Sequence, residues 1–145
     1  MAGTVLLDVA DGVATLTLNR PQALNALSVE MMEDLAEAAR ALSGRADFAV
    51  VVVKGAGEHF MAGGDLKDFS RQLSLSPDAR LAVFKAMIVQ HINPTVELLQ
   101  SLPQPVIASV RGACAGFGLS LIAGCDLVVA ADNAKFTTAY SAIAL

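Results

Sequence analysis

Three short, valine-rich runs recur along the chain, at residues 48–53, 106–110 and 126–131. The first run is apolar throughout, which is typical of a strand covered on both faces in a parallel sheet. Helical stretches separate the runs, so the order is strand, helix, strand, helix, strand. This alternation predicts an α/β domain built on a largely parallel sheet.

Two further β-rich segments precede this pattern, at residues 4–9 and 13–18. Asp11 and Gly12 lie between them, and an Asp-Gly pair supplies a turn that can adopt positive φ. The two segments are therefore predicted to form a hairpin. Its second strand alternates in polarity, as a strand with one buried face does.

Serine caps mark the starts of two predicted helices. Ser28 precedes a helix over residues 29–42, and Gly44 ends it. Ser76 and Pro77 begin a second helix, because serine caps the free amides and proline fits the first helical position.

The second helix is predicted to break near its middle. Its apolar stripe lies at residues 81, 84, 88 and 92. Pro94 removes a backbone donor, so we expect the helix to kink or divide there and to continue on a new axis over residues 95–102. A Gly-rich turn over residues 111–117 and a short helix over residues 118–124 are predicted further along.

Composition and charge limit the possible partners of this single domain, residues 1–145. Apolar residues make up 54% of the chain and charged residues 17%, and this surplus of core-forming residues predicts a partner or further chain. A net charge of −4 without a Lys/Arg cluster argues against nucleic acid. The longest uncharged apolar stretch, residues 112–125, is shorter than the ~20 residues that span a bilayer, so no membrane partner is expected. The lack of an apolar signal segment favours a cytoplasmic location.

Cysteine and histidine usage predicts no metal site. Cys114 and Cys125 lie in apolar surroundings and are expected to be buried free thiols. The two histidines, His59 and His91, lack the spacing of a ligand cluster.

Two common glycine motifs are incomplete in this chain. The dinucleotide fingerprint G-x-G-x-x-G fails from Gly55, where Phe60 takes the last position, and from Gly116, where Leu121 does. The hydrolase motif G-x-S-x-G fails around Ser120. Neither a dinucleotide site nor a serine nucleophile is favoured.

Residues 59–67, His-Phe-Met-Ala-Gly-Gly-Asp-Leu-Lys, resemble the first oxyanion-hole segment of the enoyl-CoA hydratase/isomerase, or crotonase, family. Residues 18–27 resemble the stretch with which that family contacts coenzyme A. Residues 103–118 resemble its second oxyanion-hole segment, and residues 125–136 resemble the strand beyond it. The resemblance extends in the family's order over nearly the whole chain.

The resemblance implies a crotonase fold, in which repeated ββα units form stacked sheets with helices around them. Residues 1–145 would then be an incomplete acyl-CoA-binding core, truncated before the C-terminal helices that build trimers in the family. The full-length protein is expected to be a homotrimer or a dimer of trimers. Its substrate would be an acyl-CoA, with coenzyme A as part of the substrate and no cofactor or metal required.

The same resemblance assigns the catalytic groups to the backbone N–H of Gly64 and of Phe117. A thioester enolate carries negative charge on one oxygen, which two preorganised donors can stabilise. Gly63 and Gly116 would allow the close approach that a side chain would prevent.

Coenzyme A contacts are expected around the first of these segments. The adenine end would lie against Ala62 and against Ala23 and Leu24. Arg20 and Lys67 are candidate phosphate contacts, and a solvated surface charge is the equal alternative for both. The other predicted binding residues are Gly63, Gly116, Leu66 and Asp65, and Asp65 is expected to cap or brace its turn rather than remove a proton.

The chain departs from the family's hydratases at two positions. Those hydratases carry glutamates where this chain has Ser120 and Tyr140, and neither side chain is a carboxylate base. Ser120 and Tyr140 are still expected to line the pocket. We predict double-bond isomerisation, with the acid supplied from sequence that follows Leu145. Hydration by a different acid/base set and a non-catalytic acyl-CoA-binding protein are the alternatives.

Overall fold

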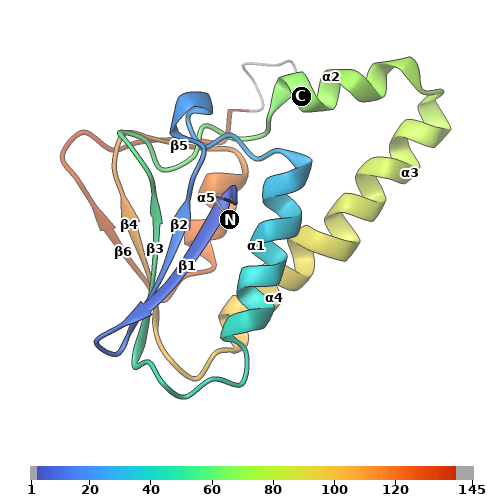
Figure 1. Ribbon diagram of the computed structural model, residues 1–145. Coiled ribbons are helices and arrows are strands. Elements are labelled where there is room, and N and C mark those ends of the chain that lie inside the picture. The colour runs from blue at the N-terminus through green and yellow to red at the C-terminus, as the bar shows by residue number, and fades with distance from the viewer. Residues whose placement is uncertain (1–2, 140–145) are drawn as a thin grey trace.

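The computed structural model describes residues 3–139, which form an α/β fold with one large and one small sheet (Figure 1). The large sheet has five strands in the order β1-β2-β3-β4-β6. They are β1 (Val5–Ala10), β2 (Val13–Leu18), β3 (Val50–Gly55), β4 (Val106–Val110) and β6 (Leu127–Ala130). β1 is antiparallel to β2, and the other neighbouring pairs are parallel. The predicted α/β class and largely parallel sheet are confirmed.

The N-terminal hairpin turns at the predicted Asp-Gly pair. Asp11 has φ 51° and Gly12 has φ 77°, positive values of the kind that a two-residue hairpin turn requires. β2 has its predicted bounds, and β1 is shifted by one residue from its predicted bounds.

The core lies between the large sheet and two helices, α1 (Val29–Leu42) and α4 (Asn93–Ser101), which lie side by side (Figure 1). Alternate residues of three strands are buried there: Ala14, Leu16, Leu18, Val51, Val53, Val106, Ala108 and Val110. In β3, Val50 and Val52 stay partly exposed. The prediction of a strand covered on both faces from Phe48 was therefore wrong for the described residues, since β3 begins at Val50 and only one of its faces is fully buried.

Both predicted serine caps are present. Ser28 Oγ accepts a hydrogen bond from the Met31 N–H at 3.2 Å, and α1 has its predicted bounds. Ser76 Oγ accepts one from the Ala79 N–H at 3.3 Å, at the start of α3 (Pro77–Met87). These local capping bonds fix where the two helices begin.

α3 extends away from the sheet as an arm, and the chain returns through a π-helical turn, η3 (Ile88–Ile92), into α4 (Figure 1). Pro94 lies in the first turn of α4, directly after the π-helical turn, so the regular α-helix is interrupted near the predicted position while the backbone stays helical, and α4 begins at Asn93 rather than at residue 95. Three residues of the predicted apolar stripe line a cavity, namely Phe84, Ile88 and Ile92. Leu81 is 68% exposed, and its place in the stripe was wrong because the outer part of the arm does not lie against the sheet.

A second, two-stranded sheet is present where the sequence suggested only a turn. β5 (Ala113–Ala115) pairs in parallel with β7 (Lys135–Thr137). The Gly-rich stretch over residues 111–117 is therefore partly strand, because its backbone partners come from another part of the chain. α5 (Phe117–Ala123) follows and begins one residue earlier than predicted.

Three short helical segments lie between the larger elements: η1 (Pro21–Ala23), α2 (Leu66–Ser70) and η2 (Arg71–Ser74). Within residues 3–139, no helix has both the length and the apolar character needed to cross a membrane.

Candidate active site

The first glycine turn is held from one side by Leu27. The Leu27 N–H donates to the Gly63 carbonyl at 2.8 Å, and the Asp65 N–H donates to the Leu27 carbonyl at 3.0 Å. Leu27 and Gly64 thus form a parallel bridge, in which the flanking residues Gly63 and Asp65 bond to Leu27 and Gly64 directs its N–H to the other side of its strand. The N–H of Gly64 therefore faces away from Leu27.

The second glycine turn is held by two neighbouring segments. The Ala115 N–H donates to the Met61 carbonyl at 2.8 Å, and the Gly116 N–H donates to the Thr137 carbonyl at 3.1 Å. Gly116 has φ 53° and ψ −121°, a conformation that a side chain makes costly. Phe117 then begins α5, so its N–H is among the first amides of a helix, which have no acceptor inside the helix.

The two turns touch at their glycines. A β-carbon built on Gly116 would lie 3.2 Å from Gly63 Cα and 4.0 Å from the Gly64 nitrogen. A β-carbon built on Gly63, whose φ is +98°, would lie 3.6 Å from the Ala115 carbonyl oxygen. The turns thus pack backbone against backbone, with little room for a side chain at Gly116.

Gly64 and Phe117 line one cavity. Among residues 3–139, the N–H of neither residue donates to a protein acceptor. Within the described part of the chain, the two turns that meet at this cavity thus each carry one amide without a protein acceptor.

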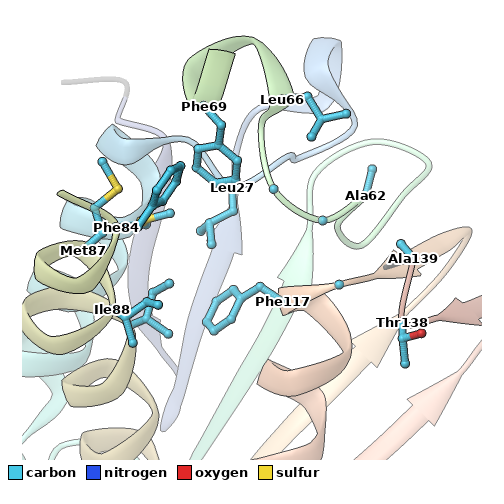
Figure 2. Close-up of a pocket in the computed structure, with 15 residues that line it drawn as sticks. Leu27, Ala62, Leu66, Phe69, Phe84, Met87, Ile88, Phe117, Thr138 and Ala139 are labelled. Atoms are coloured by element: carbon cyan, nitrogen blue, oxygen red, sulfur yellow. The ribbon is translucent and has the colours of Figure 1, made fainter. Parts of the chain in front are cut away.

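The cavity has a volume of about 520 Å³ and a largely apolar lining (Figure 2). The rings of Phe69 and Phe84 meet edge to face on one side, with centroids 5.4 Å apart. The remaining lining residues are Leu27, Met32, Ala62, Gly63, Gly64, Leu66, Met87, Ile88, Ile92, Gly116, Phe117, Thr138 and Ala139. A site of this size and character suits the apolar part of a small-molecule ligand.

A second cavity of about 480 Å³ adjoins the first and shares Ile88, Ile92 and Phe117 with it. Its other lining residues are Asn93, Val96, Glu97 and Ser120. Ser120, a predicted pocket residue, is exposed and lines this second cavity rather than the one beside the glycine turns. Glu97 is the only ionisable side chain among the described residues that line either cavity. Tyr140, the other predicted pocket residue, lies outside the described residues.

A buried asparagine organises the segment before the first turn. Asn25 is fully buried and has φ 53°. Its Nδ2 donates to the carbonyls of Ala56 at 2.9 Å and His59 at 2.8 Å, and its Oδ1 accepts from the Arg20 N–H at 2.8 Å. Sequence reasoning included Asn25 only as part of the stretch that resembles a coenzyme A contact. The signal in the sequence was the residue type, because asparagine tolerates positive φ and its side chain can donate and accept hydrogen bonds at the same time.

An ion pair braces the end of the first turn. Arg20 Nη2 donates to Asp65 Oδ2 at 2.9 Å, and Arg20 Nη1 donates to the Ala26 carbonyl. Asp65 Oδ1 also caps α2 by accepting the N–H groups of Lys67 and Asp68. Burial acts to raise the pKa of Asp65, but the hydrogen bonds from Arg20 and the two amides outweigh it and lower that pKa. Asp65 thus caps α2 and braces the first turn. Contact between Arg20 and a phosphate stays a prediction, and it would use the Arg20 N–H groups that do not bond to Asp65 or Ala26.

The residues predicted to contact coenzyme A lie next to the first turn. The Ala62 N–H donates to the Leu24 carbonyl at 3.0 Å, which places Ala23 and Leu24 beside Ala62. Leu24, Leu66 and Lys67 are exposed, and Ala62 and Leu66 also line the cavity. The structure therefore brings these residues together, and their contact with coenzyme A stays a prediction.

His59 and the cysteines have surroundings that suit structural roles. His59 Nδ1 accepts the Ala113 N–H at 3.0 Å, and His59 lines neither cavity. Cys114 is buried and Cys125 partly buried, and both are free thiols. Burial raises the pKa of each thiol to about 11, with a further contribution from Asp126 at Cys125. Residues 3–139 contain no cluster of three His, Cys, Asp or Glu side chains that could hold a metal ion.

Comparison with known proteins assigns the family. The sequence matches the family model "Enoyl-CoA hydratase/isomerase" over residues 8–144. The chain belongs to the enoyl-CoA hydratase/isomerase family. This family member is 38% identical over 141 residues to the 1,2-epoxyphenylacetyl-CoA isomerase of Escherichia coli K12, a match that covers 97% of this chain and 52% of the relative. It is 33% identical over 143 residues to a probable enoyl-CoA hydratase of Rhodobacter capsulatus, covering 98% of this chain and 51% of the relative.

Solved structures of relatives agree on the fold of this enoyl-CoA hydratase/isomerase family member. A crystal structure of a putative enoyl-CoA hydratase/isomerase from Mycobacterium abscessus aligns with a TM-score of 0.88 at 36% identity, covering 97% of this chain and 53% of that chain. The predicted crotonase fold is confirmed. The chain spans about half the length of the relatives it matches. Relatives named as an isomerase and as a hydratase both match, so family membership leaves the reaction open.

Proposed function

We propose that the protein binds an acyl-CoA thioester and stabilises its enolate with the backbone N–H groups of Gly64 and Phe117. The observation that carries this proposal is the contact between the two glycine turns, from which both residues line one apolar cavity. The names of the relatives, an acyl-CoA isomerase and a probable enoyl-CoA hydratase, support a CoA thioester as the substrate.

The chemistry requires two donors at one oxygen. Removal of a proton from the carbon next to a thioester leaves an electron pair that moves onto the carbonyl oxygen. Preorganised N–H groups stabilise that charge where water is excluded, and loss of one donor costs about 3–4 kcal/mol of transition-state stabilisation. The apolar lining around Gly64 and Phe117 suits such a site, because water competes little there.

Double-bond isomerisation is the reaction we propose. A base takes the α-proton of a β,γ-unsaturated thioester, the electron pair spreads over the thioester and the double bond, and a proton returns to the γ-carbon. Hydration instead requires an activated water beside the double bond. By the family resemblance, Ser120 takes the position of a hydratase glutamate, and its hydroxyl is not a base near neutral pH. This difference supports isomerisation over hydration.

The described residues that line the cavity with Gly64 and Phe117 include no carboxylate. This feature favours a second candidate function, a protein that binds acyl-CoA without catalysis. The two candidates differ in one measurable property, which is exchange of the α-proton with solvent.

Proton exchange from a saturated acyl-CoA in D₂O, followed by NMR, tests the proposal. Gly64→Pro removes the N–H, whereas Gly64→Ala keeps it. A β-carbon on Gly64 would lie 2.4 Å from Phe69 Cε2, so both variants displace the same ring and differ in the amide and in the restriction that proline places on Gly63. We expect exchange with Gly64→Pro to be at least about 100-fold slower than with Gly64→Ala.

The outcomes separate the candidates. Equal exchange rates for the two variants would refute stabilisation of the enolate by the Gly64 amide. Binding of the CoA thioester without exchange by the unaltered full-length protein, which includes the sequence after Leu145, would favour the non-catalytic candidate. Circular dichroism of each variant checks that the comparison is made between folded proteins.

A further inference from the structure

The side chain of Phe117 forms a boundary of the cavity beside the glycine turns. Its ring points from the start of α5 toward Ile88 (Figure 2). Phe117, Ile88 and Ile92 also line the second cavity, so these three side chains lie between spaces of about 520 and 480 Å³. We call this group of three residues the apolar partition.

The partition is assembled from two elements that are distant in sequence. Ile88 and Ile92 are the first and last residues of the π-helical turn η3, and Phe117 is the first residue of α5. A π turn changes the direction of side chains relative to a regular helix and is often found at functional sites. Here it presents two isoleucines to the same two spaces that Phe117 lines.

The ring of Phe117 is independent of the role proposed for its amide. A backbone N–H donates in the same way whichever non-proline side chain the residue carries. A glycine or alanine at position 117 would keep the amide and remove the ring. The presence of a large aromatic side chain there therefore calls for a separate explanation.

The two spaces differ in their lining. Aliphatic and aromatic side chains dominate the first, whereas Asn93, Glu97 and Ser120 contribute polar groups to the second. A hydrocarbon chain gains free energy by leaving water for the first space. Phe117 lines both spaces, so a chain that extends from the first toward the second meets its side chain.

We propose that the Phe117 side chain sets the maximum length of the acyl group that this site accepts, by closing the apolar cavity against the second cavity. This inference rests on the proposed function, because it takes the apolar cavity as the acyl site. Within the apolar cavity each added methylene strengthens binding by up to about fourfold, equivalent to ~0.8 kcal/mol. Beyond the length that reaches the ring, further methylenes give no gain.

Calorimetric titration with saturated acyl-CoAs from butanoyl- to hexadecanoyl-CoA tests this proposal. The quantity measured is the acyl length at which affinity stops rising. Phe117→Ala is expected to move that length to a longer chain, and Phe117→Leu, which keeps a smaller apolar group, is expected to move it less. Val89→Ala is the matched control, because Val89 follows Ile88, is 55% exposed and lines neither cavity.

Each outcome decides the matter. A longer limiting chain in Phe117→Ala, with Val89→Ala unchanged, supports the proposal. The same limiting length in the unaltered protein, Phe117→Ala and Phe117→Leu overturns it while leaving the proposed function standing. If the unaltered protein binds no CoA thioester of any length, the proposed function fails, and this inference fails with it.

Discussion

The Cα atom of Gly63 lies 3.2 Å from the position that a β-carbon would take on Gly116. This contact joins a turn that follows β3 to a turn that follows β5, beside the backbone hydrogen bonds that link Met61 to Ala113 and Ala115. Because the glycines touch, a side chain at Gly116 would change the spacing of the Gly64 and Phe117 amides.

Gly116→Ala should separate the two turns. The new methyl group would lie 3.2 Å from Gly63 Cα, and the alanine backbone would have to adopt the positive φ of 53°. We therefore expect a loss of about 2–3 kcal/mol in the free energy of unfolding. Urea denaturation measures this loss, and titration with acyl-CoA measures the accompanying loss of affinity.

Gly44→Ala is the matched control for that substitution. Gly44 also has a positive φ, +78°, but a β-carbon there would meet nothing within 4 Å. Only the backbone strain remains, about 1 kcal/mol. If Gly44→Ala and Gly116→Ala were equally destabilising and bound acyl-CoA equally well, the contact between Gly63 and Gly116 would not contribute to stability or to acyl-CoA binding.

Phe117→Pro should abolish one proposed donor with little structural cost. Position 117 is the first residue of α5, where proline is well tolerated because its missing N–H has no partner in the helix. Phe117→Ala also removes the ring but keeps the amide. We expect α-proton exchange to be at least about 100-fold slower in Phe117→Pro than in Phe117→Ala.

Two further measurements make that comparison decisive. The free energies of unfolding of the two variants should agree within about 1 kcal/mol. Both should also show the same limiting acyl length, because both lack the aromatic ring. Similar exchange rates in two stable, folded variants would mean that the Phe117 amide does not contact the enolate.

Local signals in the sequence were sufficient for many of the elements that position the site. The Asp11-Gly12 turn and the caps at Ser28 and Ser76 depend on residues adjacent to each element, so their positions were predicted correctly. Pro94 divides its helix for an equally local reason, since it lacks a backbone donor.

The features that the sequence did not predict depend on distant partners. β5 (Ala113–Ala115) is strand because β7 lies beside it, although glycines flank it on both sides as in a turn. Asn25 is buried because its acceptors at Ala56 and His59 belong to another segment. Similarly, family resemblance singled out Ser120 but could not tell that it lines a different cavity from Gly64.

Asn25→Ala should destabilise the protein strongly. The substitution removes three hydrogen bonds and leaves the Arg20 N–H and the carbonyls of Ala56 and His59 without these partners. At about 1 kcal/mol for each bond, we expect a loss of ~3 kcal/mol in the free energy of unfolding, measured in urea. Asn19→Ala, which removes one bond to the Gly3 carbonyl, should cost only about 1 kcal/mol.

The ion pair between Arg20 and Asp65 should make stability depend on pH. The two side chains are only 19% and 12% exposed, so solvent screens the pair less than it screens a surface pair. The pKa of Asp65 is lower in the folded protein than the ordinary value of about 4. Its contribution to stability is therefore present above that ordinary value and is lost as the pH falls through the lowered folded pKa.

Asp65→Asn tests this directly, because asparagine can still cap α2 but carries no charge. At pH 7 we expect the variant to be less stable than the unaltered protein by about 1–2 kcal/mol, with the difference shrinking below about pH 4. Urea denaturation at a series of pH values measures the difference. Asp47→Asn serves as the control, since the Arg45–Asp47 pair is exposed and should contribute little. A difference between Asp65→Asn and the unaltered protein that stays constant from neutral to acid pH would show that the charge of Asp65 does not brace the turn.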